Sequence, residues 1–569
     1  MKTIISPKQL QNISILISCL FFLSCSNKTT HTIQKTQNNA NQNSAHINQT
    51  KKIEVTVKTG TLVGNLIENT TDTKTDSKTD SKINHIAEFK GIPFAAPPIG
   101  KLRWQAPQAA TSWQGKLNTT SYKPGCMQNT AMLAMLQTPT DVSEDCLYLN
   151  VWAPQSAEQK KLPVMVWIYG GGFSGGATST PTYDGTQFAK KGVVLVSIAY
   201  RIGALGFMAH PELSQESGKG SGNYGMQDQI AGLQWIKDNI AQFGGDPTNV
   251  TIFGESAGGI SVSLLTASPA AKGLFHKAIS QSGGSFAAPM SQVLPTSNHM
   301  PTLAFAENTG VNFLKKLGVT SIREARQLSA DKIQTAVGPN IMSGFWPIAD
   351  EALFLGDQFS LYQQKQFHDT PILIGTNSNE GALFSPPNGM KKEAFIQYIQ
   401  ATLGEHAADI LAVYPHSNDK EASSAYSDIF RDSVFAWHTW AWAELQAQYG
   451  KNNAYLYYFN HRTPTAPNGA DHGSEIAYVF NNFAQPEELI RQEDHNMSAL
   501  LNQYWVNFAT YGDPNGKGLP QWPTYTEQTK KAMFLDAKSS ACTTPNLEQL
   551  KVWDKYYQAL RESTDNKGK

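Results

Sequence analysis

A serine flanked by glycines, at a predicted junction of a strand and a helix, restricts the fold of this chain more than any other sequence feature. Residues 250–253 (VTIF) are typical of a buried strand, and residues 259–265 are typical of a helix. Between them, residues 254–258 (GESAG) fit the pattern G-x-S-x-G. On such a turn the backbone is strained and the hydroxyl stands above the sheet edge. We interpret Ser256 as a candidate nucleophile; a glycine-rich turn without chemistry is the alternative.

Short, nearly continuous apolar runs recur along the chain and predict strands that are buried on both faces. They are residues 164–168 (VMVWI), 193–199 (VVLVSIA) and 371–374 (PILI). Helical patterns separate these runs, and in residues 224–243 the apolar side chains fall on one stripe. The alternation predicts an α/β fold with helices on both sides of one large, mostly parallel sheet.

Three consecutive glycines follow the predicted strand at residues 164–168. They stand in the segment Tyr169-Gly-Gly-Gly-Phe173. Glycines lose much conformational entropy on folding, so a triplet indicates a structural or chemical requirement. Close approach of bare backbone to a reacting carbonyl oxygen is one such requirement, and a flexible turn is the alternative.

A serine nucleophile needs a base, and the base needs an acid that orients it. In chains with a G-x-S-x-G turn of this kind, the acid follows the serine and the histidine comes last. Glu380 follows the predicted strand 371–374, and His472 lies in a glycine-flanked loop. His438 lies in a helical stretch, where a packing role is expected. Spacing alone does not separate His472 from its competitors, which are His406, His416, His438, His461 and His495.

Several blocks of the chain resemble the type-B carboxylesterase/lipase family. Residues 243–258 (FGGDPTNVTIFGESAG) resemble its nucleophile signature, and residues 144–154 (EDCLYLNVWAP) are similar to its second signature. Residues 89–100 and 200–207 also resemble family blocks, so the resemblance extends over nearly the whole chain from about residue 53. The family includes bacterial para-nitrobenzyl-type esterases, animal carboxylesterases and cholinesterases, and the non-catalytic neuroligins.

The resemblance implies an α/β-hydrolase fold and two-step hydrolysis of small or medium hydrophobic carboxylic esters, without a metal or an organic cofactor. The residues that it implies are the nucleophile Ser256, the acid Glu380, the base His472, the oxyanion-hole N–H groups of Gly171, Gly172 and Ala257, and a disulfide between Cys126 and Cys146. Outside the predicted disulfide, Cys542 is expected to be a buried, unreactive thiol.

Two departures from the cholinesterases argue against choline esters as substrates. The segment from Cys126 to Cys146 contains no Trp, whereas cholinesterases place a Trp that binds quaternary ammonium there. Leu383 stands where they have a second aromatic residue, and recognition of quaternary ammonium depends on aromatic faces. Two other functions are alternatives: an adhesion module on the same fold, which typically lacks the serine, and a lipase acting on emulsified fat.

The first 25 residues are predicted to be an export signal. Lys2 and Lys8 precede an apolar run of 11 residues, 13–23, which is too short to span a bilayer comfortably. Cys25 follows Leu23 and Ser24, a pattern that resembles a bacterial lipoprotein signal. We therefore expect export and attachment to a membrane of the cell envelope through a lipid on Cys25; a periplasmic or secreted protein with a plain secretory signal is the alternative.

The remaining chain divides by composition. Residues 26–52 are polar and predict a flexible tether, residues 53–562 predict one catalytic domain that closes with a helix, and residues 563–569 predict a polar tail. Residues 71–82 repeat a four-residue unit (TDTK, TDSK, TDSK), which predicts a solvated hairpin tip. Lys and Arg number 46, as do Asp and Glu, so the sequence does not indicate a nucleic-acid partner, which would require a clustered basic surface.

Overall fold

A computed structural model describes the chain over residues 51–68, 83, 85–129, 133–134, 136–139, 141–155, 161–290, 299–338, 344–483 and 485–567. The predicted signal, Cys25, most of the predicted tether and the repeat at 71–82 lie outside the described residues, so lipidation of Cys25 stays a prediction. Of the helices within these ranges, none is long and apolar enough to cross a membrane.

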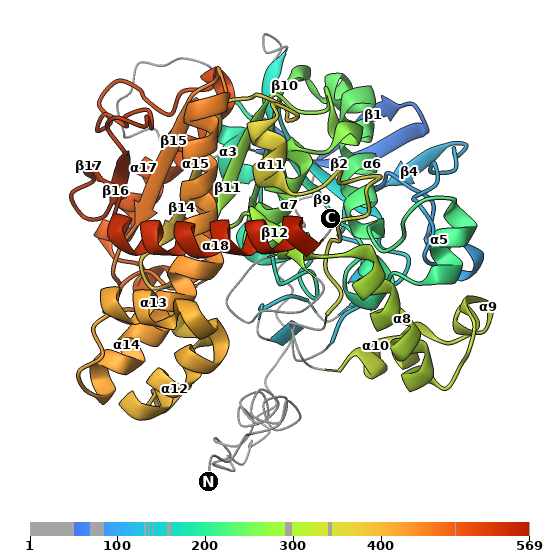
Figure 1. The fold of residues 1–569 in the computed structure, drawn as a ribbon. Coiled ribbons are helices and arrows are strands. Elements are labelled where there is room, and N and C mark those ends of the chain that lie inside the picture. The colour runs from blue at the N-terminus through green and yellow to red at the C-terminus, as the bar shows by residue number, and fades with distance from the viewer. Residues whose placement is uncertain are drawn as a thin grey trace, which may run out of the picture.

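One 13-stranded sheet organises the molecule (Figure 1). Its strands, in spatial order, are β1 (Lys51–Val57), β2 (Gly60–Glu68), β3 (His85–Pro93), β7 (Tyr148–Gln155), β9 (Val194–Ile198), β8 (Leu162–Ile168), β10 (Gly245–Glu255), β11 (Lys277–Gln281), β14 (Ile372–Asn377), β15 (Ala454–Phe459), β16 (Lys531–Leu535) and β17 (Ser540–Thr543), with β4 (Lys116–Asn118) beside β2. The seven strands from β9 to β16 in this order are parallel, and antiparallel pairs lie at both edges. The predicted large, mostly parallel sheet is confirmed.

Helices cover both faces of this sheet. Those of the described residues are α3 (Thr186–Lys190), α4 (Gly203–Phe207), α5 (Pro211–Ser217), α6 (Tyr224–Asn239), α7 (Ala257–Thr266), α8 (Leu303–Leu317), α9 (Ile322–Ala325), α10 (Ala330–Val337), α11 (Gln358–Gln363), α12 (Lys392–Leu403), α13 (Ala407–Val413), α14 (Asp419–Phe430), α15 (Trp437–Tyr449), α16 (Glu475–Phe480), α17 (Gln492–Tyr511) and α18 (Leu547–Lys567). In Figure 1, α18 runs across the front of α15, and α12, α13 and α14 form a lobe below them.

Both ends of the folded domain differ from the sequence expectation. β1 begins at Lys51, where it pairs with Leu66 of β2, so the last two residues of the expected 26–52 tether belong to the sheet. The closing helix of the predicted domain 53–562 is α18, which begins at Leu547 and continues to Lys567, well into the predicted polar tail at 563–569. Backbone hydrogen bonds thus extend order beyond the apolar pattern at both ends, because pairing of the main chain needs no buried side chain.

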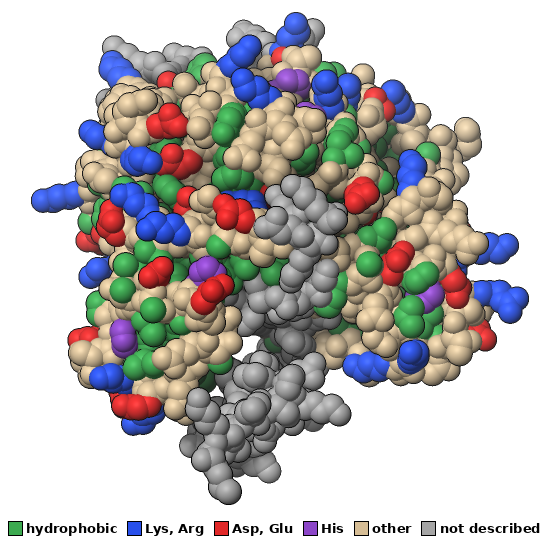
Figure 2. Space-filling view, viewed as in Figure 1, with side chains coloured by type: hydrophobic (Ala, Val, Ile, Leu, Met, Phe, Trp, Pro, Cys, Tyr) green, Lys and Arg blue, Asp and Glu red, His purple; other side chains and the backbone are tan. Residues whose placement is uncertain are grey.

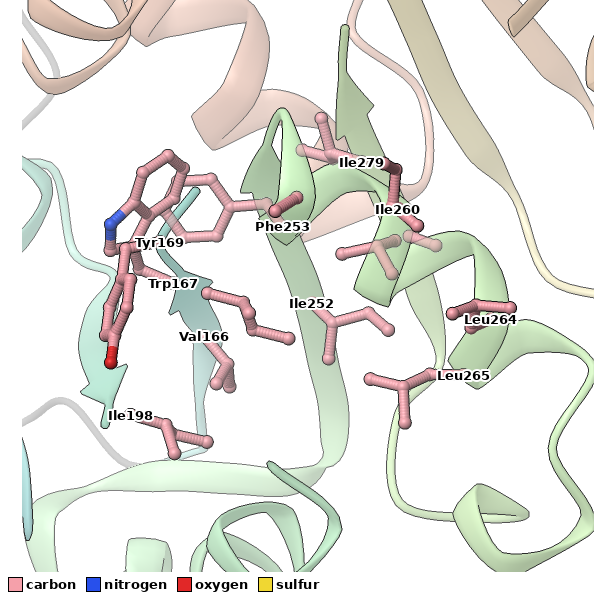
Figure 3. Packing of buried hydrophobic residues seen from close by; sticks show 14 of the residues in the cluster. Val166, Trp167, Tyr169, Ile198, Ile252, Phe253, Ile260, Leu264, Leu265 and Ile279 are labelled. Carbon is pink, nitrogen blue, oxygen red and sulfur yellow. The ribbon is translucent and has the colours of Figure 1, made fainter. Parts of the chain in front are cut away.

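Side chains of the central strands alternate between the two faces of the sheet (Figure 3). Trp167 of β8 and Phe253 of β10 lie side by side, with ring centroids 4.9 Å apart, and both contact Phe480 of α16. Ile252 is buried between the strand neighbour Val166 and α7 (Figure 3). Burial on both faces explains why these strands read as continuous apolar runs in the sequence.

The parallel order of the central strands places four loops at one edge of the sheet. The loops that follow β8, β10, β14 and β15 carry Gly171, Ser256, Glu380 and His472 respectively. In open α/β sheets, ligands bind beyond the carboxyl ends of the strands. The topology therefore brings segments that are far apart in the sequence to a common location.

Charged side chains are mixed on the surface. On the face shown in Figure 2, Asp and Glu side chains lie between the Lys and Arg side chains over most of the area. This mixing agrees with the equal numbers of acidic and basic residues in the chain. Among the described residues on this face, no broad basic patch of the kind that nucleic-acid binding requires is visible.

Candidate active site

Ser256 occupies a strained turn between β10 and α7. Its backbone has φ 53° and ψ −122°, a conformation that non-glycine residues rarely adopt. Backbone hydrogen bonds hold the turn: the N–H of Ser256 donates to the carbonyl of Gln281 at 2.8 Å, and its carbonyl accepts from Ile260 at 2.8 Å. The surrounding main chain therefore holds Ser256 in this strained conformation, which is the conformation expected of a nucleophile on a strand-to-helix turn.

The glycines around Ser256 permit close contact between main chains. A Cβ atom on Gly258 would come within 2.0 Å of the carbonyl oxygen of Ile168, at the end of β8. A Cβ on Gly170 would come within 2.6 Å of the carbonyl oxygen of Glu255 and 3.0 Å of the Cβ of Ser256. The glycine-rich loop after β8 therefore lies directly against the turn that carries Ser256.

The backbone of the glycine-rich loop turns sharply beside the serine. Gly171, Gly172 and Phe173 all have positive φ, of 105°, 59° and 53°. The carbonyl of Gly171 accepts hydrogen bonds from the N–H groups of Ser174 and Gly175, both at 3.0 Å. On the other side, the N–H of Ala257 belongs to the first turn of α7, where N–H groups have no partner within the helix.

Glu380 and His472 are in direct contact, 92 residues apart in the chain. The Nδ1 atom of His472 lies 2.5 Å from Oε2 of Glu380, whose side chain is fully buried. The other carboxylate oxygen, Oε1, accepts from the N–H of Asn377 at 2.7 Å and from the hydroxyl of Ser282 at 2.5 Å. These bonds fix the carboxylate and favour the tautomer of His472 that carries its proton on Nδ1.

A second carboxylate, which the sequence interpretation missed, faces the other nitrogen of the base. Oε1 of Glu255 lies 3.3 Å from Nε2 of His472. Burial raises the pKa of Glu255 to about 8, although His472 opposes this shift. Burial also disfavours the charged imidazole, but Glu255 and Glu380 outweigh that effect and raise the pKa of His472 to about 9. The pKa values of Glu255 and His472 depend on each other. When Glu255 is protonated it loses its negative charge, and the pKa of His472 is then lower.

Glu475 is a third buried carboxylate near the base. Its Oε1 accepts from the amide of Gln281 at 2.9 Å, and its Oε2 accepts from the amide of Asn377 at 2.5 Å. Burial raises its pKa, and the charge of Glu380 adds to that effect. Glu255 lies within the segment GESAG, and Glu475 stands three residues after His472, but a sequence pattern does not show which way a side chain points.

The histidines that compete with His472 in the sequence have other partners. Nε2 of His461 lies 2.7 Å from Asp494. His438 is fully buried, accepts from the N–H of Phe286 at 3.0 Å, and has a pKa that burial lowers to about 3. Neither of them contacts Glu380 within the described part of the chain, so the structure brings His472, not these two, to the acid. His406, His416 and His495 pair with Glu405, the carbonyl of Tyr414, and Glu487.

The predicted disulfide between Cys126 and Cys146 is confirmed, and it closes a loop with a sequence separation of 20 residues. Closing a loop of this size adds about 3 kcal/mol to the free energy of unfolding. Cys542, on edge strand β17, is a free thiol that is half-buried rather than buried as expected, and partial burial raises its pKa. A raised pKa lowers the thiolate fraction, which agrees with the expected low reactivity.

A wide α/β sheet with a serine on a strained strand-to-helix turn defines the α/β-hydrolases. Residues 51–553 match the model of the carboxylesterase family. The chain is 36% identical to para-nitrobenzyl esterase of Bacillus subtilis (strain 168) over 479 residues, 82% of this chain and 94% of the relative. It is 34% identical to fumonisin B1 esterase of Sphingopyxis macrogoltabida over 461 residues, 79% of this chain and 83% of the relative.

The comparison with solved structures also finds an esterase. A structure of PNB esterase superposes with a TM-score of 0.73 at 32% identity, covering 88% of this chain and 99% of the other. The chain therefore belongs to the carboxylesterase family, and it is a serine hydrolase of carboxylic esters.

Proposed function

We propose that this enzyme hydrolyses small or medium hydrophobic carboxylic esters through an acyl-enzyme on Ser256, with His472 as the base and Glu380 as the acid. The observation that carries the assignment is the 2.5 Å contact between Nδ1 of His472 and Glu380, because it leaves Nε2 directed at Glu255, the residue directly before Ser256. A base held in this way can accept a proton only at Nε2.

The reaction takes place in two steps. In the first, Nε2 of His472 takes the hydroxyl proton of Ser256 while the serine oxygen attacks the ester carbonyl. The resulting oxyanion is stabilised by the N–H groups of Gly171, Gly172 and Ala257, and the alcohol leaves with the proton from His472. In the second step, water loses a proton to His472 and attacks the acyl-enzyme. The bond to the serine oxygen then breaks, His472 returns the proton to that oxygen, and the carboxylic acid leaves.

Aromatic side chains around these residues support a hydrophobic substrate. Phe384 contacts the ring of His472, and Phe173, next to the glycine triplet, contacts Trp346 with ring centroids 5.2 Å apart. Two relatives carry the names of a para-nitrobenzyl esterase and a fumonisin B1 esterase, and each name specifies an ester. An apolar acyl or alcohol group is the chemistry that such aromatic surroundings favour.

The substrate class is tested with purified protein and para-nitrophenyl esters of graded acyl length, beside an emulsified long-chain triglyceride. We expect saturation kinetics with soluble short and medium esters. Rates that rise only above the solubility limit of the substrate would instead indicate a lipase. Absence of hydrolysis of every ester in the panel would contradict the proposal.

The pH dependence of the reaction is expected to depend on Glu255. Only neutral His472 can act as a base, so kcat/KM falls as the pH decreases through the pKa of His472. Glu255 raises that pKa. Glu255→Gln removes the charge, so the acid limb of the profile is expected to move to lower pH by about one unit.

A matched control for this shift is Glu475→Gln. Glu475 is also buried, but its oxygens bind the amides of Gln281 and Asn377 rather than the imidazole. Its effect on the acid limb should therefore be smaller than that of Glu255→Gln. Equal shifts in the two variants, or an unchanged profile in Glu255→Gln, would show that Glu255 is not the carboxylate that tunes the base.

A further inference from the structure

The imidazole of His472 is packed against two phenylalanine rings. The ring of Phe435 lies nearly parallel to it, with centroids 4.5 Å apart and an interplanar angle of 26°. Phe384 meets it edge-on, with centroids 5.5 Å apart and an angle of 63°. Glu380 and Glu255 occupy the two nitrogen ends of the imidazole. Phe435 thus covers a flat face of the base.

Phe435 belongs to a π-helical turn, η7 (Arg431–Ala436), which joins α14 to α15 without a break. Such turns are rare and frequently mark functional sites. An inserted residue in a helix changes the direction in which the neighbouring side chains point. All six residues of η7 are buried, so the turn is part of the core rather than a surface irregularity.

Arg431 connects this turn to the loop that carries Glu380. Its guanidinium donates to the carbonyl of Ser378 at 3.1 Å, to Asp428 at 2.6 Å and to Asp432 at 2.8 Å. Ser378 lies two residues before Glu380. One buried element therefore holds both the ring on the face of the base and the loop of the acid.

We propose that Phe435 is a positioning residue for ester hydrolysis, an inference that rests on the proposed role of His472 as the base. Its ring holds the imidazole in the orientation in which Nδ1 faces Glu380 and Nε2 faces the turn of Ser256. Its π face also stabilises the imidazolium that forms when Ser256 loses its proton, because aromatic faces attract cations. An aliphatic side chain fills the same space without providing a π face.

Phe435→Leu tests this role, since it retains an apolar side chain and removes the aromatic face. We expect kcat to fall about tenfold with little change in KM, because the lost interaction acts on the imidazolium and not on the bound ester. The acid limb of the pH profile should also move to lower pH, since the charged imidazole loses a stabilising neighbour. The substitution leaves the charged groups around the imidazole of His472 in place. These groups are Glu255 of β10, Glu380 of η5 (Glu380–Phe384) and Glu475 of α16. On the π turn itself, Arg431 and Asp432 form an ion pair with each other.

Phe435→Tyr retains the aromatic face and should keep most of the wild-type kcat. Phe395→Leu is the matched control: Phe395 is fully buried in α12, and its ring lies 5.8 Å from that of His416, a histidine outside the site. Steady-state kinetics and a thermal melt are measured for all three variants.

Wild-type kcat and an unchanged pH profile in Phe435→Leu would overturn the proposal. An equal loss of kcat in Phe395→Leu would also overturn it, since the effect would then come from lost packing in general. Failure of the proposed function gives a different result: the wild type would lack esterase activity, or Ser256→Ala would retain it.

Discussion

Ser256→Ala is expected to lower kcat for ester hydrolysis by a factor on the order of 10⁴ to 10⁶ while leaving the fold intact. The hydroxyl is the group that forms the acyl-enzyme, and without it His472 has no nucleophile to deprotonate. The hydrogen bonds that hold the turn, to Gln281 and Ile260, involve only the backbone of Ser256. Steady-state kinetics with a soluble para-nitrophenyl ester measures the loss, and circular dichroism tests the fold.

Ser261→Ala is the matched control for this substitution. Ser261 is buried in the same helix, α7, but its hydroxyl bonds Gln229 and the carbonyl of Ala257 at 3.0 Å each. We expect activity close to that of the wild type. The free energy of unfolding should decrease by about 1 kcal/mol, because the hydrogen bonds of the hydroxyl are lost. Near-wild-type turnover by Ser256→Ala would exclude Ser256 as the nucleophile.

Glu380→Gln is expected to lower kcat by about 10³ to 10⁴ with little change in substrate binding. Oε1 of Glu380 accepts from Asn377 and Ser282, so the carbonyl oxygen of a glutamine would take that place. Its NH₂ group would then face Nδ1 of His472 and donate to it. This arrangement favours the tautomer with the proton on Nε2, which cannot accept the proton of Ser256.

Asp471→Asn is the control for the identity of the acid. Asp471 is next to His472 in the chain, but its carboxylate accepts from the amide of Asn379 at 2.7 Å. We expect its substitution to change kcat far less than Glu380→Gln does. The opposite result, with Glu380→Gln active and Asp471→Asn inactive, would mean that the acid is misassigned.

Features that depend on neighbouring residues could be predicted from the sequence. The turn of Ser256 could be predicted because its strand, its flanking glycines and its helix are contiguous, and each has a local requirement. The apolar runs at 164–168, 193–199, 250–253 and 371–374 correspond to β8, β9, β10 and β14, because strands that are buried on both faces need apolar side chains throughout.

Other features depended on the family resemblance rather than on the residues alone. Spacing did not distinguish His472 from five other histidines, since a histidine carries no local signal of its partner. The disulfide between Cys126 and Cys146 was likewise an implication of the resemblance, and the structure confirmed it.

The tertiary structure alone decided what surrounds the base. Glu255, Glu475 and Phe435 come from three different elements, and each reaches His472 or its neighbours through contacts that the order of residues does not encode. The sequence determined which segments become strands, turns and helices, because those choices follow from local propensity and burial. Only the packing of the parallel sheet, which brings the ends of β10, β14 and β15 to one edge, determined which side chains meet there and therefore the charge and orientation of the base.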